Sequence, residues 1–410
     1  MEQDVSKAVP IGAGVVCALV GSTSSFAVVL AGLRAAGANP QQAASGLVAL
    51  FLAMGAASML LSWRFRMPIT SAWSTPGAAL LITTGALAGG WPAAVGAFAV
   101  TAVLLLATGL WPALARLVTR IPNPIAQAML AGVLLPLCIA PVTALAHDPG
   151  VIAPVLAVWL IALALRPRWA VPAAFGAALV VIAVTLARDH TVPAASAWIP
   201  HLQITTPSLT LAALTGIALP LYIVTMAAQN IPGVAVMAGF GYRVPWRPAL
   251  TVTGIGSLLA TPFGGHAVNL AAISAALAAA PDADPNPRRR WVAGFTAGAA
   301  YCALGLVSTG LTAAVLAAPP GVVQAVAGVA LLGAFAGACA GAMADESVRI
   351  PAAVTLVVAA SGTTVAGVGA AFWALVVGVL IHWLTSLPRV SQNRHAASTS
   401  SNTLGRETPN

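Results

Sequence analysis

The chain has 410 residues, of which 59% are hydrophobic and only 7% are charged. A soluble globular domain carries roughly a quarter charged residues, so this composition excludes that class of protein. The net charge is +9, but the arginines stand in ones, twos and threes between long apolar runs and form no continuous basic face. No nucleic-acid partner is therefore expected, and the lipid bilayer is the predicted environment of almost the whole chain.

Apolar runs of about twenty residues, the length of helix that crosses a bilayer, recur along the chain. The first is too long for a cleaved signal peptide and is interrupted by the polar run GSTSS at residues 21–25, so we expect it to be retained. We predict an all-α polytopic membrane protein with about fourteen transmembrane spans. The predicted spans are residues 9–32, 41–62, 68–88, 91–113, 122–144, 149–165, 169–187, 209–232, 246–262, 263–281, 291–311, 319–341, 350–366 and 368–387.

The basic residues alternate between successive loops, and this alternation indicates the topology. With the N-terminus in the cytoplasm, all of the 18 lysines and arginines except Arg34 and Arg188 fall in cytoplasmic segments, as the positive-inside rule requires. Both termini are therefore predicted to be cytoplasmic. The run Arg288, Arg289 and Arg290 is interpreted as a cytoplasmic loop anchor, and the polar, Ser-rich tail is predicted to be disordered.

Spans one to seven and eight to fourteen can be overlaid at an offset of about 195 residues, and an odd number of spans per half makes the second copy inverted. IPNPIAQAMLAG, with Pro122 and Gln127, matches APPGVVQAVAGV, with Pro319 and Gln324. MPITSAWSTPGAALL matches ATPFGGHAVNLAAIS at a similar offset. Inverted repeats of this kind are typical of secondary transporters.

Span three is expected to be broken. Residues 69–75, ITSAWST, are polar and β-branched enough to be extended, and Thr75 followed by Pro76 indicates the cap and first residue of a helix that starts within the membrane. Ordinary proline and glycine kinks are the alternative interpretation of this break and of its counterpart in span ten.

Span ten shows the same pattern of an extended segment followed by a helix start. Thr261 and Pro262 end one helix, residues 263–268 are expected to be extended, and Asn269 is expected to cap a helix over 270–280. Backbone that is not helical at membrane depth needs protein or a watery cavity around it, so the two extended segments predict an enclosed site between them.

Both helix starts would direct free N–H groups and a positive dipole end at this site, which suits a carboxylate. No Asp, Glu, Lys or Arg falls within a predicted span interior, which disfavours a sodium site or a cationic substrate. An anionic substrate is therefore expected. The candidate substrate-binding residues are Ser24, Ser25, Trp73, Ser74, Thr75, Gln229, Asn230, Phe263, Gly264, Gly265, His266 and Asn269.

Each of these side chains also has a purely structural alternative. Trp73 can be plain core or interfacial packing, and the serines of span one can form a small-residue packing interface. Gln229, Asn230 and His266 can bond neighbouring helices. The four cysteines lie inside apolar runs without metal-ligand spacing, so neither a disulfide nor a metal is expected. No cofactor is expected, and the lack of HExxH, nucleophile and clustered-carboxylate motifs argues against an enzyme.

GSTSSFAVVLAG, PITSAWSTPGAALL, QNIPG and PFGGHAVNLAAISAA together resemble the BenE family of benzoate:proton symporters, and the likeness runs over essentially the whole chain. The predicted arrangement of spans is more distantly similar to that of the uracil and xanthine permeases and the sulfate-type anion transporters. The resemblance implies import of benzoate or a related aromatic carboxylate with protons, by alternating access, across a bacterial inner membrane.

In uracil permeases an acidic residue of span eight helps to bind substrate and couple protons, and the matching position here is Gln229, which cannot titrate. Proton coupling, which the resemblance implies, would then use His266 or the carboxyl group of the substrate. Histidine is chemically suited to this role because it titrates near neutral pH. A permease for another small organic anion or a nucleobase, and a passive anion channel, remain alternatives, and the oligomeric state is left open, with a homodimer as one alternative.

The distant similarity also implies a substrate-carrying core and a gate domain. The expected division is 1–8 cytoplasmic N-terminus, 9–115 and 209–311 core, 116–190 and 312–388 gate, 191–208 periplasmic loop and 389–410 cytoplasmic tail.

Overall fold

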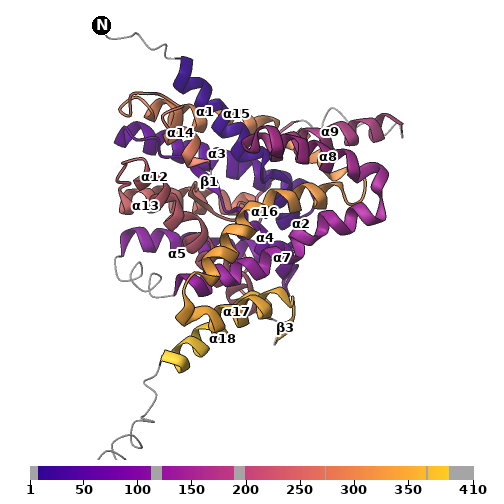
Figure 1. Ribbon diagram of the computed structural model, residues 1–410, viewed down its shortest axis with the longest axis vertical. Coiled ribbons are helices and arrows are strands. Elements are labelled where there is room, and N and C mark those ends of the chain that lie inside the picture. The colour runs from indigo at the N-terminus through magenta and orange to yellow at the C-terminus, as the bar shows by residue number, and fades with distance from the viewer. Residues whose placement is uncertain (1–7, 112–121, 189–198, 273, 366–367, 387–410) are drawn as a thin grey trace, which may run out of the picture.

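The computed structural model describes residues 8–111, 122–188, 199–272, 274–365 and 368–386, and the predicted tail lies outside them. It is a bundle of helices with very short strands (Figure 1). The first half of the chain forms α1 (Ala8–Thr23), α2 (Phe26–Ala35), α3 (Pro40–Phe65), β1 (Ser71–Trp73), α4 (Thr75–Thr84), α5 (Gly90–Leu110), α7 (Asn123–His147), α8 (Pro149–Leu165), η1 (Pro167–Trp169) and α9 (Ala170–Arg188).

The second half contains two π-helical segments, η3 and η4, inside one long helical stretch. Its elements are α10 (Leu211–Ala213), η3 (Leu214–Ala218), α11 (Leu219–Thr225), η4 (Met226–Asn230), α12 (Ile231–Gly239), α13 (Trp246–Ala260), η5 (Thr261–Phe263), β2 (Val268–Leu270), α14 (Ala275–Ala279), α15 (Trp291–Leu316), α16 (Val322–Met343), η6 (Glu346–Val348), α17 (Arg349–Ala360), β3 (Thr364–Val365), β4 (Val368–Gly369) and α18 (Ala370–Ser386).

Eight helical stretches in the described residues are long and apolar enough to cross a bilayer. They coincide with predicted spans one, two, four, five, seven, eight, eleven and twelve, and the shorter apolar helices α8 and α18 coincide with spans six and fourteen. The polytopic helical class is confirmed, and so is the interruption of spans three and ten by strands. The total of fourteen spans and the inverted repeat stay predictions.

The outer helices expose large apolar side chains that only lipid can cover. Leu160 and Ile161 of α8 are 56% and 60% exposed, and Leu306 and Val307 of α15 are 57% and 56% exposed. Apolar surface on this scale marks a membrane-facing protein. The chain is therefore a multi-pass membrane protein.

The two halves of the chain pack together as one bundle. Helix α3 packs against α15 and α13, α13 against α5, and α1 against α15. A second group is formed by α7, which packs against α16 and α17, and by α18 on α17. In Figure 1, α17 and α18 lie at the opposite end of the long axis from α1. Neither half has a core of its own, because each group draws helices from both.

The helix ends that carry arginines meet on one side of the first group. The Arg66 guanidinium lies 4.2 Å from the centre of the Trp291 ring, and Arg247 donates to the carbonyl of Leu110 over 3.1 Å. These contacts join the ends of α3 and α5 to the starts of α15 and α13. The predicted topology requires the same grouping, since it places all of these segments in the cytoplasm.

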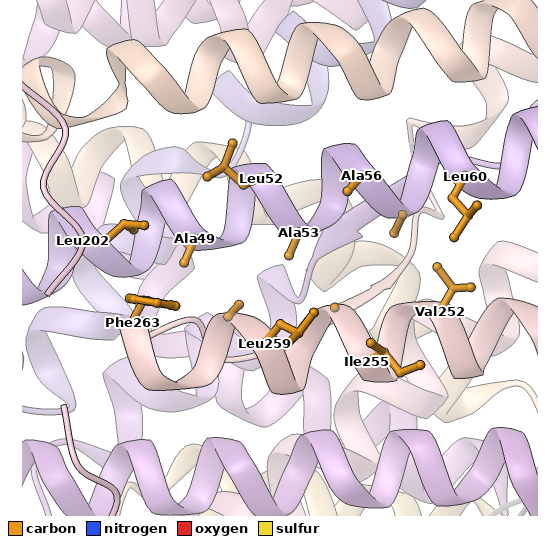
Figure 2. Close-up of a pocket in the computed structure, with 13 residues that line it drawn as sticks. Ala49, Leu52, Ala53, Ala56, Leu60, Leu202, Val252, Ile255, Leu259 and Phe263 are labelled. Carbon is orange, nitrogen blue, oxygen red and sulfur yellow. The ribbon is translucent and has the colours of Figure 1, made fainter. Parts of the chain in front are cut away.

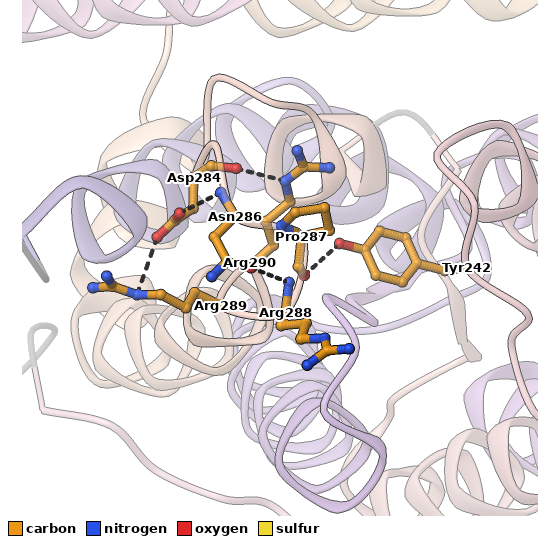
Figure 3. Close-up of polar contacts among 7 residues, drawn as sticks. All are labelled: Tyr242, Asp284, Asn286, Pro287, Arg288, Arg289 and Arg290. Atoms are coloured by element: carbon orange, nitrogen blue, oxygen red, sulfur yellow. Dashed lines mark hydrogen bonds and ion pairs between the residues drawn. The ribbon is translucent and has the colours of Figure 1, made fainter. Parts of the chain in front are cut away.

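Hydrogen bonds and an ion pair hold the loop between α14 and α15 in place (Figure 3). Arg290 is buried, and its guanidinium donates to the carbonyls of Asp284 and Ala279 over 2.7 and 2.9 Å. The buried Asp284 carboxylate accepts from the Asn286 N–H at 2.8 Å and pairs with Arg289 at 3.5 Å. Arg290 therefore has a structural role that the interpretation of the arginine run as a loop anchor did not include.

The same loop is tied to the segment between α12 and α13. The Tyr242 hydroxyl donates to the carbonyl of Pro287 over 2.8 Å. Burial raises the pKa of the Tyr242 phenol above its ordinary value, by more than the neighbouring Arg290 guanidinium lowers it. The phenol therefore keeps its proton, and the hydrogen bond, throughout the neutral range.

Candidate functional site

Strands β1 and β2 come from the predicted breaks in spans three and ten and pair with each other in antiparallel register. Ser71 pairs with Leu270, Ala72 with Asn269, and Trp73 with Val268. The ladder extends one step at each end, because Ser74 N–H donates to Ala267 (3.1 Å) and Ala271 N–H donates to Thr70 (2.9 Å). The predicted extended segments are therefore confirmed, and they lie side by side.

Two strands at membrane depth leave outward N–H groups that lipid cannot satisfy. Side chains from three neighbouring elements accept these hydrogen bonds. The pairs are Ser71 N–H to Ser58 Oγ of α3 (2.8 Å), Val268 N–H to Ser257 Oγ of α13 (2.8 Å) and Leu270 N–H to Asn230 Oδ1 of η4 (2.9 Å). The sequence alone does not distinguish these two serines, because a single serine in an apolar helix carries no distinguishing pattern.

The start of α4 is where the sequence placed it, but its cap is one residue earlier. Ser74, not Thr75, is the N-cap: its Oγ accepts from the N–H of Gly77 over 3.2 Å, and its carbonyl accepts from the N–H of Ala78. The strand ladder holds Ser74 outside the helix. Thr75 thus becomes the first helical residue, followed by Pro76, and it is only half-buried.

The prediction that Asn269 caps a second helix is wrong. Asn269 lies in the middle of β2, fully buried, and its Nδ2 donates to the carbonyl of Leu270 over 2.8 Å. Pairing with β1 keeps the chain extended as far as Ala271, and the next helix, α14, has only five residues and no side-chain cap from Ser274. Among the described residues of span ten, no helix start is therefore equivalent to that of α4.

Span one is also interrupted, as a turn at Ser24 and Ser25 separates α1 from α2. Ser25 Oγ accepts a hydrogen bond from the indole Nε1 of Trp73 over 2.7 Å. Ser24 instead bonds back to the carbonyl of Gly21 (3.2 Å). Trp73 is buried edge-to-face on Phe51, with ring centres 4.8 Å apart. Phe51 was not predicted, since an aromatic residue within an apolar run is the pattern of ordinary core.

Span eight contacts β2 through its second π segment, η4, and the N-cap of α4 through the last residue of α11. Thr225 Oγ1 lies 2.8 Å from Ser74 Oγ, and Asn230 accepts from Leu270 as described above. Gln229 lies between these two contacts and is 9% exposed. Such π segments are frequent at functional sites. Thr225 was missed, although its position four residues before Gln229 places the two on one helix face.

His266 is fully buried and joins span ten to span three. Its Nε2 lies 2.9 Å from the carbonyl oxygen of Ser74. A carbonyl only accepts, so Nε2 carries the proton and Nδ1 presents a lone pair. Among the described residues Nδ1 has no hydrogen-bond partner, and neither has Asn269 Oδ1. The ring packs edge-on against Phe98, with ring centres 6.2 Å apart.

The residues before His266 shape the turn instead of facing the strands. Gly264 has a φ of +94°, and a Cβ there would lie 2.8 Å from Cζ2 of Trp91, so only glycine fits. A Cβ on Gly265 would lie 2.6 Å from Cβ of Ala260. The Phe263 side chain lines an apolar groove between α3 and α13. Phe263 is therefore not brought together with Trp73.

Spans one, three, eight and ten are thus joined by hydrogen bonds around the strand pair. The links are Ser25 to Trp73 (spans one and three), Ser74 to Thr225 (three and eight), Asn230 to Leu270 (eight and ten) and His266 to Ser74 (ten and three). In the part of the chain that the structure describes, no Asp, Glu, Lys or Arg lies in these linked segments. These segments therefore offer a ligand polar side chains and a helix dipole, and no side chain that is permanently charged.

Comparisons with known proteins agree with this architecture. The family BenE, described as benzoate membrane transport protein, matches residues 4–384. Inner membrane protein YdcO of Escherichia coli (strain K12) is 38% identical over 376 residues, which cover 92% of this chain and 95% of that protein. Benzoate membrane transport protein of Acinetobacter baylyi (strain ATCC 33305 / BD413 / ADP1) is 28% identical over 396 residues, covering 95% and 98%.

Solved structures of anion transporters share the fold at low sequence identity. The transmembrane domain of a cyanobacterium bicarbonate transporter, BicA, has a TM-score of 0.57 and 16% identity and covers 92% of this chain and 96% of that one. SLC26A9 has a TM-score of 0.60 and 13% identity, covering 92% of this chain and 65% of that one. From its match to the family model and its identity to the first relative, the chain belongs to the benzoate membrane transport family.

Proposed function

We propose that the protein imports benzoate or a related aromatic carboxylate together with protons, by alternating access. The observation that carries the proposal is the hydrogen-bonded junction of spans one, three, eight and ten in a chain of the benzoate membrane transport family. Interrupted spans at membrane depth are where secondary transporters bind their substrates.

In this proposal the carboxylate lies at the start of α4. The N–H groups of Gly77 and Ala78 are already bonded to Ser74, and Pro76 has none, so α4 offers its dipole end together with the N–H and hydroxyl of Thr75. A helix N-terminus favours an anion without any basic side chain. The amide of Gln229 is the second donor, since η4 holds this residue next to the junction.

The aromatic ring would lie against Trp73, which Phe51 supports from the other side. Offset and edge-to-face contacts between aromatic rings contribute about 0.5–1.5 kcal/mol beyond the buried area. Phe263 is not part of this wall, because its side chain lines the groove between α3 and α13. Ser24 and Ser25 complete the wall from the turn in span one.

Proton coupling follows from charge balance. The described residues of the junction are neutral, so a bound carboxylate alone would give the moving part of the protein one unpaired negative charge. An unpaired charge in a dry interior costs several kcal/mol even after relaxation. A proton on the substrate or on Nδ1 of His266 would remove this cost, and the lone pair of Nδ1 has no other partner among the described residues.

The moving part would be the core, α1 to α5 and α10 to α15, and the gate would be α7 to α9 and α16 to α18. This division agrees with the two packing groups of helices. Helices α4 and α7, and α2 and α16, pack across the boundary between these groups. Sliding at that boundary would expose the start of α4 to each side of the membrane in turn.

Uptake by the purified protein in proteoliposomes tests the proposal. With the vesicle interior alkaline, radiolabelled benzoate is expected to accumulate above its external concentration faster than in protein-free vesicles, into which neutral benzoic acid diffuses unaided, and an uncoupler is expected to abolish the accumulation. Uptake that only equilibrates would instead indicate a passive channel. Unlabelled aromatic acids, aliphatic acids and nucleobases are then added as competitors; stronger competition by a nucleobase than by benzoate would contradict the aromatic carboxylate.

A further inference from the structure

An apolar groove of about 380 Å³ runs between α3 and α13 (Figure 2). Small residues form its floor, among them Ala53 and Ala56 of α3 and Gly256 of α13. Larger side chains form its rim, and Leu60 and Leu259 there are 48% and 67% exposed. A water molecule occupies about 30 Å³ of liquid volume, so the groove has room for roughly a dozen heavy atoms.

The length of the groove matches one leaflet of a bilayer. Along α3 it reaches from Leu60 to Ala49, which is about 16 Å at the helical rise of 1.5 Å per residue. The hydrocarbon core of a bilayer is about 30 Å thick, so one leaflet contributes about half of that. An extended hydrocarbon chain that enters at the Leu60 end would be covered for about the depth of its own leaflet.

The Leu60 end of the groove is positively charged. Arg64 lies one helical turn beyond Leu60 on the same face of α3, and it is exposed. Arg243 is exposed in the segment before α13, between Tyr242 and Val244. Within the described part of the chain neither arginine forms an ion pair.

The sequence neighbours of the two arginines pack against one apolar cluster, which includes Leu61 beside the Leu60 end of the groove. Phe65, next to Arg64, packs in one apolar cluster with Tyr242 and Val244, which flank Arg243. Val252, which lines the groove, belongs to the same cluster. Trp63, 53% exposed beside Arg64, is the kind of aromatic residue that lies at the level of lipid headgroups.

We propose that this groove binds one acyl chain of an anionic phospholipid from the leaflet on the arginine side, with the phosphate of the headgroup held by Arg64 and Arg243. The apolar lining excludes a polar ligand, and the length and the charge at a single end fit a lipid lying along the helices. A second copy of the protein would not explain why the exposed charge gathers at one end of the groove.

Filling the groove tests the position of the acyl chain. Ala56→Phe places a ring in the groove at an exposed position, and Ala157→Phe makes the same change at an exposed position of α8 as the control. Native mass spectrometry of each delipidated protein, titrated with phosphatidylglycerol, counts bound lipids. We expect Ala56→Phe to lose one tightly bound lipid and Ala157→Phe to keep it; equal lipid retention by wild type and Ala56→Phe would overturn the proposal.

Removing the charges tests the headgroup contact and leaves the groove intact. Each arginine beside an anionic headgroup contributes roughly fivefold to binding, so Arg64→Gln with Arg243→Gln should weaken phosphatidylglycerol binding about 25-fold. Phosphatidylcholine has the same phosphate but no net charge, so its binding should weaken less. The matched control is Arg166→Gln with Arg168→Gln, two exposed arginines beside η1. Equal loss in both double variants, or a dimer mass that Ala56→Phe dissociates, would count against a lipid site.

Discussion

His266 Nε2 donates to the carbonyl oxygen of Ser74 over 2.9 Å, and this bond fixes the turn before β2 to the N-cap of α4. The donor belongs to the second half of the chain and the acceptor to the first. A ligand at the start of α4 would therefore lie next to a titratable ring whose orientation is already set by that same helix start.

His266 is the first test of proton coupling. His266→Gln keeps a side-chain N–H that can reach Ser74 but cannot titrate, whereas His266→Ala removes both properties. We expect both variants to lose benzoate accumulation driven by a proton gradient, and only His266→Ala to unfold at a lower temperature. Gradient-driven accumulation at the wild-type level in His266→Gln would remove His266 from the proton path and leave the carboxyl group of the substrate as the carrier.

Gln229→Glu tests whether the carboxylate lies beside η4. Two like charges at this buried junction would repel each other, so benzoate binding should weaken by at least tenfold at pH 8, which corresponds to about 1.4 kcal/mol. At lower pH the introduced carboxyl group takes up a proton and affinity should recover. Gln324→Glu, at an exposed position of α16, is the control and should bind benzoate like the wild type at both pH values in a radioligand assay.

The bond between Ser74 and Thr225 can be measured by a double-mutant cycle. Thr225→Val removes the hydroxyl that lies 2.8 Å from Ser74 Oγ and keeps the shape of the side chain. Ser74→Ala removes the same bond together with the cap of α4, which contributes about 1 kcal/mol. We expect the two changes to couple by about 1 kcal/mol in thermal unfolding. Strict additivity would mean that spans three and eight are not linked here.

Gly264→Ala tests the turn that presents His266. The positive φ costs a residue with a Cβ about 1–3 kcal/mol, and that Cβ would also approach Trp91 within 2.8 Å of Cζ2. We expect a clear fall in the melting temperature and in uptake. Gly176→Ala is the control, because Gly176 lies in α9 with nothing near its added Cβ. It should be neutral or slightly stabilising.

Tyr242→Phe tests the hydrogen bond that joins the segment between α12 and α13 to the loop between α14 and α15. Losing the bond to Pro287 should cost about 0.5–1 kcal/mol near neutral pH. The pKa of Tyr242 is raised by burial, so the folded state keeps the proton longer than the unfolded state. The contribution is then complete below the unfolded pKa of about 10 and is lost as the pH rises through the folded value. The gap in melting temperature between wild type and variant should therefore narrow above pH 10 and stay constant from pH 7 to 9.

The sequence was most informative where local chemistry and tertiary structure agree. Residues 69–75 combine polar and β-branched side chains next to a proline, and both the strand β1 and the start of α4 were found there. Eight of the predicted spans coincide with helical stretches long enough to cross a bilayer, because bilayer thickness sets the length of such an apolar run.

The errors came from long-range pairing. Thr75 and Asn269 are both good caps in isolation, but the ladder between β1 and β2 keeps Ser74 outside α4 and keeps Asn269 extended. Local propensity cannot report a partner strand that lies elsewhere in the chain. The buried role of Arg290 was invisible for the same reason, because its acceptors are backbone carbonyls that exist only once the loop has folded.

The pairing of Trp73 with Val268 joins positions 195 residues apart, and it has a consequence for biosynthesis. Residues 69–75 enter the membrane long before their partner strand is made, so the N–H groups of β1 that face β2 must wait for that strand or find temporary partners. Insertion of the first half alone therefore leaves an unfinished β edge at membrane depth. A truncated chain that ends before β2 would present this edge to the membrane quality-control proteases as a marker of incomplete synthesis.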